Sequence, residues 1–228
     1  MLLALFGAAV ALSFWGGIDE AVSGLFYQPG RGFPAAHDPL VATLRLSTSA
    51  AGYGAGAFLL FALLWRVILG RPLLGLGRAA VVYLIAVFLL GPALLVNGVL
   101  KAEWGRARPA QTVLFGGTRQ YTPPLLPAAQ CERNCSFVSG EASVGFAFVA
   151  FGFAATTPAR RRLGIAAGLA LGAAFGLLRI AEGGHFLSDV YFAGLFMVGL
   201  AWLLHALLIG RRWLERLGLR PQEANGRP

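Results

Sequence analysis

The sequence predicts an all-α integral membrane protein, a bundle of six transmembrane helices. Of the 228 residues, 57% are hydrophobic and 13% are charged, and the mean hydropathy is +0.68. Soluble domains carry about 25% charged residues. The apolar residues also gather in long runs separated by short polar segments, as in multi-pass membrane proteins. We treat residues 1–228 as a single membrane domain.

Six apolar runs account for the expected spans. In chain order they cover residues 2–17, 51–69, 79–100, 137–156, 163–178 and 186–209. The first run is short, because a span takes about 20 apolar residues. No basic segment precedes it, as one does in a cleaved signal peptide, so we expect a membrane helix there. Pro92 lies inside the third run, where a proline kinks a membrane helix without ending it.

Two longer polar segments are predicted to lie outside the bilayer. The first, residues 18–50, holds the turn-forming residues Pro29, Gly30, Gly32, Pro34 and Pro39. Such residues indicate a loop. The second, residues 101–136, is the longest polar stretch and holds Pro109, Pro123, Pro124 and Pro127. We expect loops or short helices there.

Arginines in the connecting segments predict the orientation of the bundle. They follow the second, fourth and sixth runs: Arg71, Arg78, Arg160, Arg161, Arg162, Arg211, Arg212, Arg216 and Arg220. With six spans these segments share one side, which is cytoplasmic because Lys and Arg accumulate there. The basic tail at 211–228 is then cytoplasmic, and the segments at 18–50, 101–136 and 179–185 face outward. A five-span alternative, with the first run removed, leaves this assignment unchanged.

The net charge of +9 does not indicate a nucleic-acid partner. The arginines cluster at membrane boundaries, and no nucleic-acid motif or basic–aromatic repeat accompanies them.

The two cysteines, Cys131 and Cys135, lie four residues apart in the long outer segment. A disulfide between them is allowed in an oxidising compartment. Two reduced thiols are the alternative. A metal pair is disfavoured, because two thiols without a nearby histidine make a poor zinc site.

A cluster of charged residues separates the fifth and sixth runs. Arg179, His185 and Asp189 fall within eleven residues at a membrane boundary, where charge is costly and usually functional. If Asp189 lies in the first turn of the last helix, its carboxylate can hold His185 and leave the other ring nitrogen free to attack or to accept a proton. Arg179 offers paired donors for phosphate oxygens. The alternative is a helix boundary whose polar side chains reach into water.

Two earlier segments carry further candidates for anion binding. Lys101, the single lysine of the chain, precedes Arg108 at the end of the third run, and its ammonium is a flexible point charge. Ser139 and Gly140 open the fourth run, where free backbone N–H groups at a helix start bind anions. The alternatives are a lysine that reaches the headgroups and a serine N-cap with Glu141 in the first turn.

Other charged residues are assigned to local pairs. Glu103 and Arg106 could bridge each other on the loop, and Glu182 could pair with an arginine of the site or cap a helix.

Together these segments read Lys-x6-Arg-Pro, Ser-Gly-x and Arg-x5-His-x3-Asp. The three in this order closely resemble the type 2 phosphatidic acid phosphatase family, over roughly residues 101–189. The phosphate ligands implied by the resemblance are Lys101, Arg108, Ser139, Gly140 and Arg179. His185 would be the nucleophile, forming a phosphohistidine, and Asp189 would orient it. No metal or cofactor is implied, because three cations supply the charge stabilisation that a metal otherwise gives.

The chain departs from the family pattern at two positions. The second motif usually reads Pro-Ser-Gly-His, but here Glu141 replaces the histidine that would protonate the leaving oxygen. The third motif usually begins Ser-Arg, and here Leu178 precedes the arginine. The strings Cys-Ser-Phe-Val-Ser-Gly-Glu and Gly-Gly-His-Phe-Leu-Ser-Asp resemble a bacterial subgroup that includes lipid A 4'-phosphatases. This implies a Gram-negative inner-membrane enzyme whose active site faces the periplasm, with Glu141 as a candidate catalytic acid.

Glycines in the fifth run predict close helix packing. Gly164, Gly168, Gly172 and Gly176 recur every four residues, and such stripes let membrane helices approach closely. Arg179 continues this stripe and is therefore expected to face the bundle interior.

Three function hypotheses follow from the motifs. The first is a phosphatase that hydrolyses a phosphate monoester on a membrane phospholipid or lipid A-type substrate. The second is a phosphotransferase, in which a lipid hydroxyl replaces water. The third is a non-catalytic membrane binding protein. Undecaprenyl pyrophosphate, phosphatidylglycerophosphate and phosphatidic acid are alternative substrates of an enzyme with these motifs.

Overall fold

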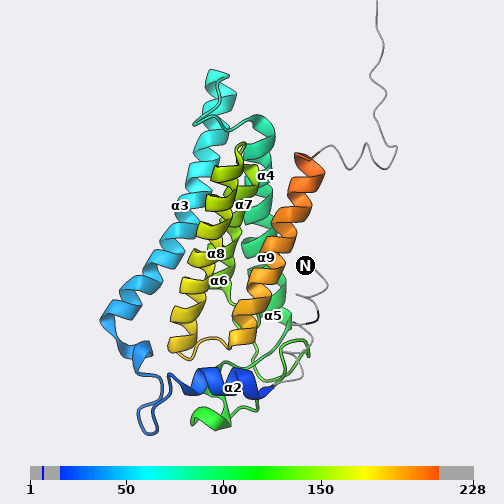
Figure 1. Cartoon of the computed structure of the whole chain (residues 1–228). Coiled ribbons are helices and arrows are strands. Elements are labelled where there is room, and N and C mark those ends of the chain that lie inside the picture. Colours follow the sequence, from blue (N-terminus) through cyan, green and yellow to red (C-terminus); the bar gives the residue numbers. More distant parts are fainter. Residues whose placement is uncertain (1–6, 8–15, 211–228) are drawn as a thin grey trace, which may run out of the picture.

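The computed structural model describes Gly7 and residues 16–210, and all regular elements among these residues are helical apart from two isolated β-bridges (Figure 1). The all-α prediction is confirmed for this part of the chain. The predicted first span at residues 2–17 falls almost entirely outside the described residues, and the basic tail at 211–228 falls wholly outside them.

Four helices in the described ranges are long and apolar enough to cross a membrane. They are α3 (Pro39–Leu69), the continuous helix Arg78–Glu103, α8 (Pro158–Ala181) and α9 (Leu187–Leu208). The second consists of α4 (Arg78–Phe88), η2 (Leu89–Leu100) and α5 (Lys101–Glu103). A shorter apolar segment, formed by α6 (Gly140–Ala147) and α7 (Val149–Ala154), lies in the middle of the bundle (Figure 1).

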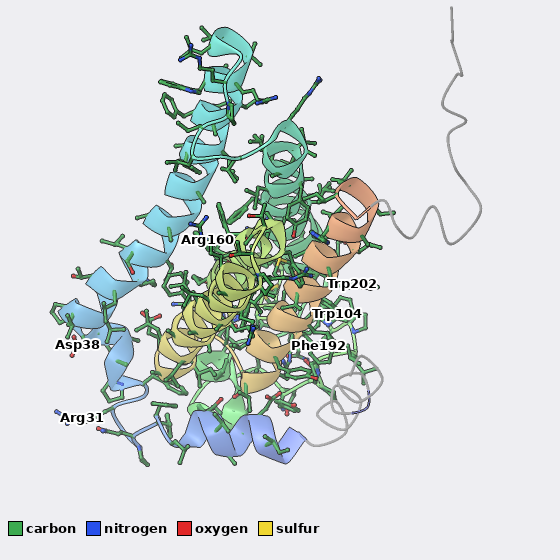
Figure 2. The ribbon with its side chains drawn as sticks, turned by 45° about the horizontal axis from the view of Figure 1, so that its top comes forward. Arg31, Asp38, Trp104, Arg160, Phe192 and Trp202 are labelled. Atoms are coloured by element: carbon green, nitrogen blue, oxygen red, sulfur yellow. A yellow bond between two sulfur atoms is a disulfide. The ribbon has the colours of Figure 1, made fainter. Side chains whose placement is uncertain are left out.

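Helix α3 begins twelve residues earlier than the predicted start of the second run at residue 51. Pro39 was expected to mark a loop, and this expectation is wrong because proline also suits the first position of a helix. Asp38 caps the helix through Oδ1, which accepts from the backbone N–H groups of Leu40 at 2.7 Å and Val41 at 3.3 Å. Figure 2 shows Asp38 at this end of α3. The helix ends at Gly70, whose φ of 67° is left-handed.

The outer segments contain short helices rather than loops alone. Helix α2 (Gly16–Gly24) lies across one end of the bundle (Figure 1). Single 3-10 turns follow at Pro34–His37, Pro109–Gln111 and Val113–Phe115. The aromatic rings of Tyr27, Phe33 and Phe115 pack together with centroids 5.2–5.5 Å apart, and so join the two outer segments.

Two predicted spans are irregular. The third contains Pro92 and is π-helical from Leu89 to Leu100, which is how this helix accommodates the missing N–H group of proline. The fourth is interrupted at Phe148, between α6 and α7. Arg160, Arg161 and Arg162, which were assigned to a connection, lie instead in the first turn of α8, because Thr157 caps that helix and Pro158 begins it.

The predicted glycine stripe is confirmed as the contact face of α8. A Cβ atom on Gly164 would lie 2.6 Å from Cα of Gly152, and one on Gly168 would lie 2.4 Å from the backbone N of Val149. A Cβ on Gly172 would lie 2.3 Å from the ring of Phe146. Helices α6 and α7 therefore approach α8 at backbone distance, and only glycine fits between them.

This close approach predicts a stability effect at Gly168. Gly168→Ala places a methyl group against the backbone of α7, and such overpacking costs about 1–3 kcal/mol. The expected fall in melting temperature is roughly 2–4 °C per kcal/mol in a chain of this size. Gly199→Ala in α9 is the matched control, since a Cβ there meets nothing within 4 Å. Equal melting temperatures of the two purified variants in detergent would contradict the packing.

The residues of the three motifs all lie at one end of the bundle. The third span and α8 end there, and α6 and α9 begin there, next to α2 (Figure 1). The connection at residues 70–77 and the start of α8, which carry the arginines, lie at the opposite end. The topology of the described helices thus separates the motif residues from these basic segments.

Candidate active site

His185 is fully buried in the turn between α8 and α9. Its Nδ1 lies 2.7 Å from the backbone carbonyl oxygen of Ser136. Because a carbonyl only accepts, Nδ1 carries a proton, and in the neutral imidazole Nε2 then keeps its lone pair. Nε2 has no hydrogen-bond partner among the described residues. This is the state that a histidine nucleophile requires.

Asp189 lies in the first turn of α9, as expected, but it does not hold His185 directly. Its Oδ2 is 3.8 Å from Nδ1 of His185, beyond hydrogen-bond distance. The carboxylate instead accepts from Ser136 Oγ at 2.5 Å, Phe186 N at 2.8 Å and Arg106 Nη1 at 2.5 Å. The two side chains thus lie within ion-pair distance, but the expected direct hydrogen bond is not formed because Nδ1 is directed to the carbonyl oxygen of Ser136. Ser136 connects the two residues.

The three expected phosphate-binding cations gather around Glu141, the carboxylate that faces Nε2 of His185. Arg179 is buried, and its Nε lies 3.3 Å from Oε1 of Glu141, whose Oε2 is 3.6 Å from Nε2 of His185. Lys101 lies against Gly140, where a Cβ atom would be 2.8 Å from Nζ. Burial, and then the neighbouring Arg179, lower the pKa of Arg108 from its ordinary value. Clustered cations of this kind bind an oxyanion strongly.

A disulfide-closed turn holds two of these cations. Cys131 and Cys135 are joined, and Asn134 lies within the loop that they close. The carbonyl oxygen of Asn134 accepts from Arg108 Nη2 at 2.8 Å, and its Oδ1 accepts from Lys101 Nζ at 3.4 Å. The disulfide alternative for the cysteines is therefore the one found, and its loop contacts the candidate phosphate site.

Two glutamates surround Arg179. Glu182 forms a buried ion pair with Arg179 Nη1. Of the two roles expected for it, pairing with an arginine of the site is therefore observed. Glu141 is partly exposed, and its Oε2 has no hydrogen-bond partner among the described residues. Arg45 of α3 lies 3.9 Å from Glu182 and extends the cluster toward that helix. Glu141 is thus the acidic group that faces Nε2 of His185, with 3.6 Å between Oε2 and Nε2.

Ser139 and Gly140 begin α6 in two distinct ways. The Ser139 hydroxyl accepts from the N–H of Ala142 at 3.4 Å and so acts as the N-cap that the sequence left as an alternative. Gly140 leaves room for the Lys101 ammonium, because a Cβ atom at this position would push Nζ away from its place. The first N–H groups of a helix have no backbone partner within it, and Gly140 places those of α6 next to the Lys101 ammonium.

A groove leads from the cluster along α3. It has a volume of about 600 Å³ and is bounded at one end by Lys101, Gly140 and Glu141. Its remaining walls are mostly apolar and come from α3, α4, η2 and α6, including Leu59, Leu63, Phe88 and Pro92. The described structure therefore combines a polar site with an apolar path.

Sequence reasoning missed the residues that support Asp189. Arg106 was expected to pair with Glu103, and this is wrong: Arg106 is fully buried and binds Asp19 and Asp189, at 2.8 Å and 2.5 Å. Its position two residues before Arg108 was the only available signal, since Asp19 and Asp189 lie 87 and 83 residues away in the chain. Ser136 is part of the string Cys-Ser-Phe-Val-Ser-Gly-Glu, but it was assigned no role from the sequence.

Comparison with known proteins identifies the family of the chain. The family described as the PAP2 superfamily matches residues 79–213. The lipid A 4'-phosphatase of Francisella tularensis subsp. novicida is 38% identical over 135 residues, which are 59% of this chain and 61% of the relative. The Rhizobium leguminosarum enzyme of the same name is 46% identical over 104 residues, covering 45% of this chain and 43% of the relative.

A third lipid A 4'-phosphatase, from Rhizobium etli, is 42% identical over 104 residues, covering 45% of this chain and 39% of the relative. The chain thus spans less than two thirds of the length of these curated relatives. No solved structure matches it significantly. The matched region contains all three motifs and the helices that carry them, from α4 to α9. The chain therefore belongs to the PAP2 superfamily.

Proposed function

We propose that this protein is a lipid phosphatase that hydrolyses a phosphate monoester through a phosphohistidine on His185. The observation that carries the proposal is the buried Nε2 of His185, which has no partner in the described structure and faces a cluster of three cations. A binding protein needs the cations but has no use for an unprotonated imidazole nitrogen held in one tautomer. The non-catalytic hypothesis is therefore disfavoured.

In the proposed reaction, the phosphate binds to Arg179, Lys101, Arg108 and the first N–H groups of α6. Nε2 of His185 attacks phosphorus, the bond to the lipid oxygen breaks, and that oxygen takes a proton. Water then attacks the phosphohistidine, releases inorganic phosphate and restores the imidazole. The three cations stabilise the charge on the transferring group throughout. No metal ion is required in this scheme.

Lipid A is the proposed substrate because three relatives carry the name lipid A 4'-phosphatase. The apolar groove beside the site supports a lipid substrate of some kind. We place the site on the periplasmic side of the inner membrane, because it lies at the end of the bundle opposite the arginine-bearing segments, which favour the cytoplasm.

Phosphate release from a panel of lipids tests this function. Purified protein is incubated with lipid A, undecaprenyl pyrophosphate, phosphatidylglycerophosphate and phosphatidic acid, and inorganic phosphate is measured. We expect the fastest release from lipid A. Phosphorylated lipid products in place of inorganic phosphate would indicate the phosphotransferase alternative, and inactivity on every lipid would contradict both enzymes.

Glu141 is proposed as the acid that protonates the leaving oxygen. In the free site its Oε2 and Nε2 of His185 face each other at 3.6 Å. Once the negative phosphate enters, it partly cancels the surrounding cations and so favours the protonated form of the Glu141 carboxyl. An acid must be protonated to act, so activity should fall as the pH rises above the optimum.

Glu141→Gln tests this role. The amide keeps the size of the side chain but delivers no proton, so kcat should fall by about 10²-fold or more. The acid-side optimum should also be lost, and the alkaline limb of the pH profile should flatten. Glu103→Gln is the control, because Glu103 is exposed at the same end of the bundle. A Glu141→Gln variant with parental kcat and an unchanged pH profile would show that Glu141 is structural.

A further inference from the structure

A buried chain of charges connects α2 to Asp189. We call it the Asp19–Arg106–Asp189 chain. Arg106 Nη2 donates to Asp19 at 2.8 Å, Nη1 donates to Asp189 at 2.5 Å and to Ser188 Oγ at 2.9 Å, and Nε donates to the carbonyl oxygen of Thr122 at 2.8 Å. All three members of the chain are at least 99% buried. Burial alone would lower the pKa of Arg106, but Asp189 and Asp19 outweigh it, and the pKa is raised.

Asp19 is held as firmly as the arginine. Its carboxylate accepts from Ser188 N at 2.8 Å, from Ser188 Oγ at 2.5 Å and from Tyr121 Oη at 3.1 Å, in addition to Arg106. Asp19 belongs to α2, which lies outside the family match at residues 79–213. A carboxylate from outside the family region thus completes the surroundings of a family-motif residue.

The chain reaches His185 through two further hydrogen bonds. One Asp189 oxygen accepts a hydrogen bond from the Arg106 guanidinium, and the other accepts one from the hydroxyl of Ser136 at 2.5 Å. The carbonyl oxygen of the same Ser136 receives the Nδ1 proton of His185 at 2.7 Å. Since Arg106 Nη1, Ser136 Oγ and Phe186 N all donate to it, the Asp189 carboxylate is fixed in place. A displacement of Asp189 would therefore also displace Ser136, whose carbonyl oxygen sets the tautomer of the imidazole.

We infer that Asp19 and Arg106 are positioning residues for the nucleophile. They hold His185 in its Nδ1–H tautomer through Asp189 and Ser136, so that Nε2 stays unprotonated and correctly placed. The inference rests on the proposed function, since it assigns this purpose to the phosphatase site. Removal of one charge breaks the balance of a buried ion network, which is far more costly than the loss of an exposed pair. The resulting displacement of Asp189 should reach the His185 imidazole through the hydrogen bonds of Ser136.

Asp19→Asn is the main test, because it removes the charge and keeps the shape. We expect kcat to fall by about 10–100-fold, the range seen when outer partners of functional histidines are removed, while KM changes little because the cation cluster is untouched. Glu20→Gln, the neighbouring carboxylate of α2, is the matched control and should keep the parental kcat. Tyr121→Phe, which removes one donor to Asp19 and leaves every charge, should lower kcat by roughly two- to tenfold.

A second readout does not depend on turnover. In ¹⁵N-histidine-labelled protein, we expect the His185 signal, assigned with the His185→Gln variant, to report the Nδ1–H tautomer in the parent. Asp19→Asn and Arg106→Lys should give a mixture of tautomers. Melting temperatures are recorded for every variant, and kcat is expressed per folded enzyme.

The outcomes separate the two ideas. Unchanged kcat and an unchanged His185 tautomer in folded Asp19→Asn and Tyr121→Phe would overturn the positioning role. So would a fall in melting temperature alone. An inactive parent whose tautomer still responds to Asp19→Asn would instead count against the proposed function and leave the positioning role supported.

Discussion

His185→Ala is expected to reduce lipid phosphate release to the background rate. Removal of a covalent nucleophile lowers kcat by about 10⁴- to 10⁶-fold in well-studied enzymes, because no other group can form the covalent intermediate. Nε2 of His185 is a buried nitrogen that has no hydrogen-bond partner among the described residues. Phosphohistidine, trapped by rapid acid-free quenching of the enzyme with labelled substrate, should appear in the parent and vanish in the variant.

The controls for this experiment separate chemistry from folding. His185 is fully buried, so alanine also leaves the carbonyl oxygen of Ser136 without its partner, at a cost of about 1–3 kcal/mol. His185→Gln can restore that hydrogen bond but cannot attack phosphorus. It should therefore fold like the parent and stay inactive. His37→Ala removes an exposed histidine and should change nothing. Turnover by either His185 variant would rule out the nucleophile assignment.

Loss of any one cation of the cluster is expected to have the next largest effect. Lys101→Ala, Arg108→Ala and Arg179→Ala should each lower kcat/KM by about 10²- to 10³-fold, as removal of a single donor to a reacting oxyanion does. Arg179→Ala should be the most severe, since it also leaves Glu141 and Glu182 without their ion pair. A buried carboxylate without its partner is strongly destabilising.

Arg160→Ala measures the effect of charge loss by itself. Arg160 is exposed at the opposite end of the bundle, so its loss should leave kcat/KM unchanged. Arg179→Lys keeps the charge and should recover melting temperature better than activity, because an ammonium lacks the paired donors of a guanidinium. Similar losses in all four alanine variants would point to stability as the common cause.

The apolar runs predicted most of the helices because burial in lipid requires continuous apolar sequence. Helix α9 begins and ends within one residue of the predicted run. The failures lie where local capping decides the boundary. Asp38 and Pro39 start α3 far outside its apolar run, and Phe148 interrupts the fourth span although the residues on either side of it are apolar.

Only the residues of the candidate site that belong to the three sequence motifs were predictable. The short sequence separation of Arg179, His185 and Asp189 predicted that they lie close together, because a short turn connects the two helices that carry them. Spacing also suggested a direct bond between the last two, which is not formed because Nδ1 of His185 is directed to the carbonyl oxygen of Ser136. Asp19 is joined to Arg106 by tertiary folding alone, and no periodicity or composition marks it in the sequence.

The groove beside α3 has a kinetic consequence for a lipid substrate. Its walls include Tyr53, Leu60 and Leu89, which are exposed on the surface that the helices present to the bilayer. A molecule that enters there diffuses in two dimensions within the leaflet and never passes through water. The rate then follows the mole fraction of substrate in the bilayer, so dilution with neutral lipid slows the enzyme at constant bulk concentration. The Michaelis constant of such an enzyme is a surface density.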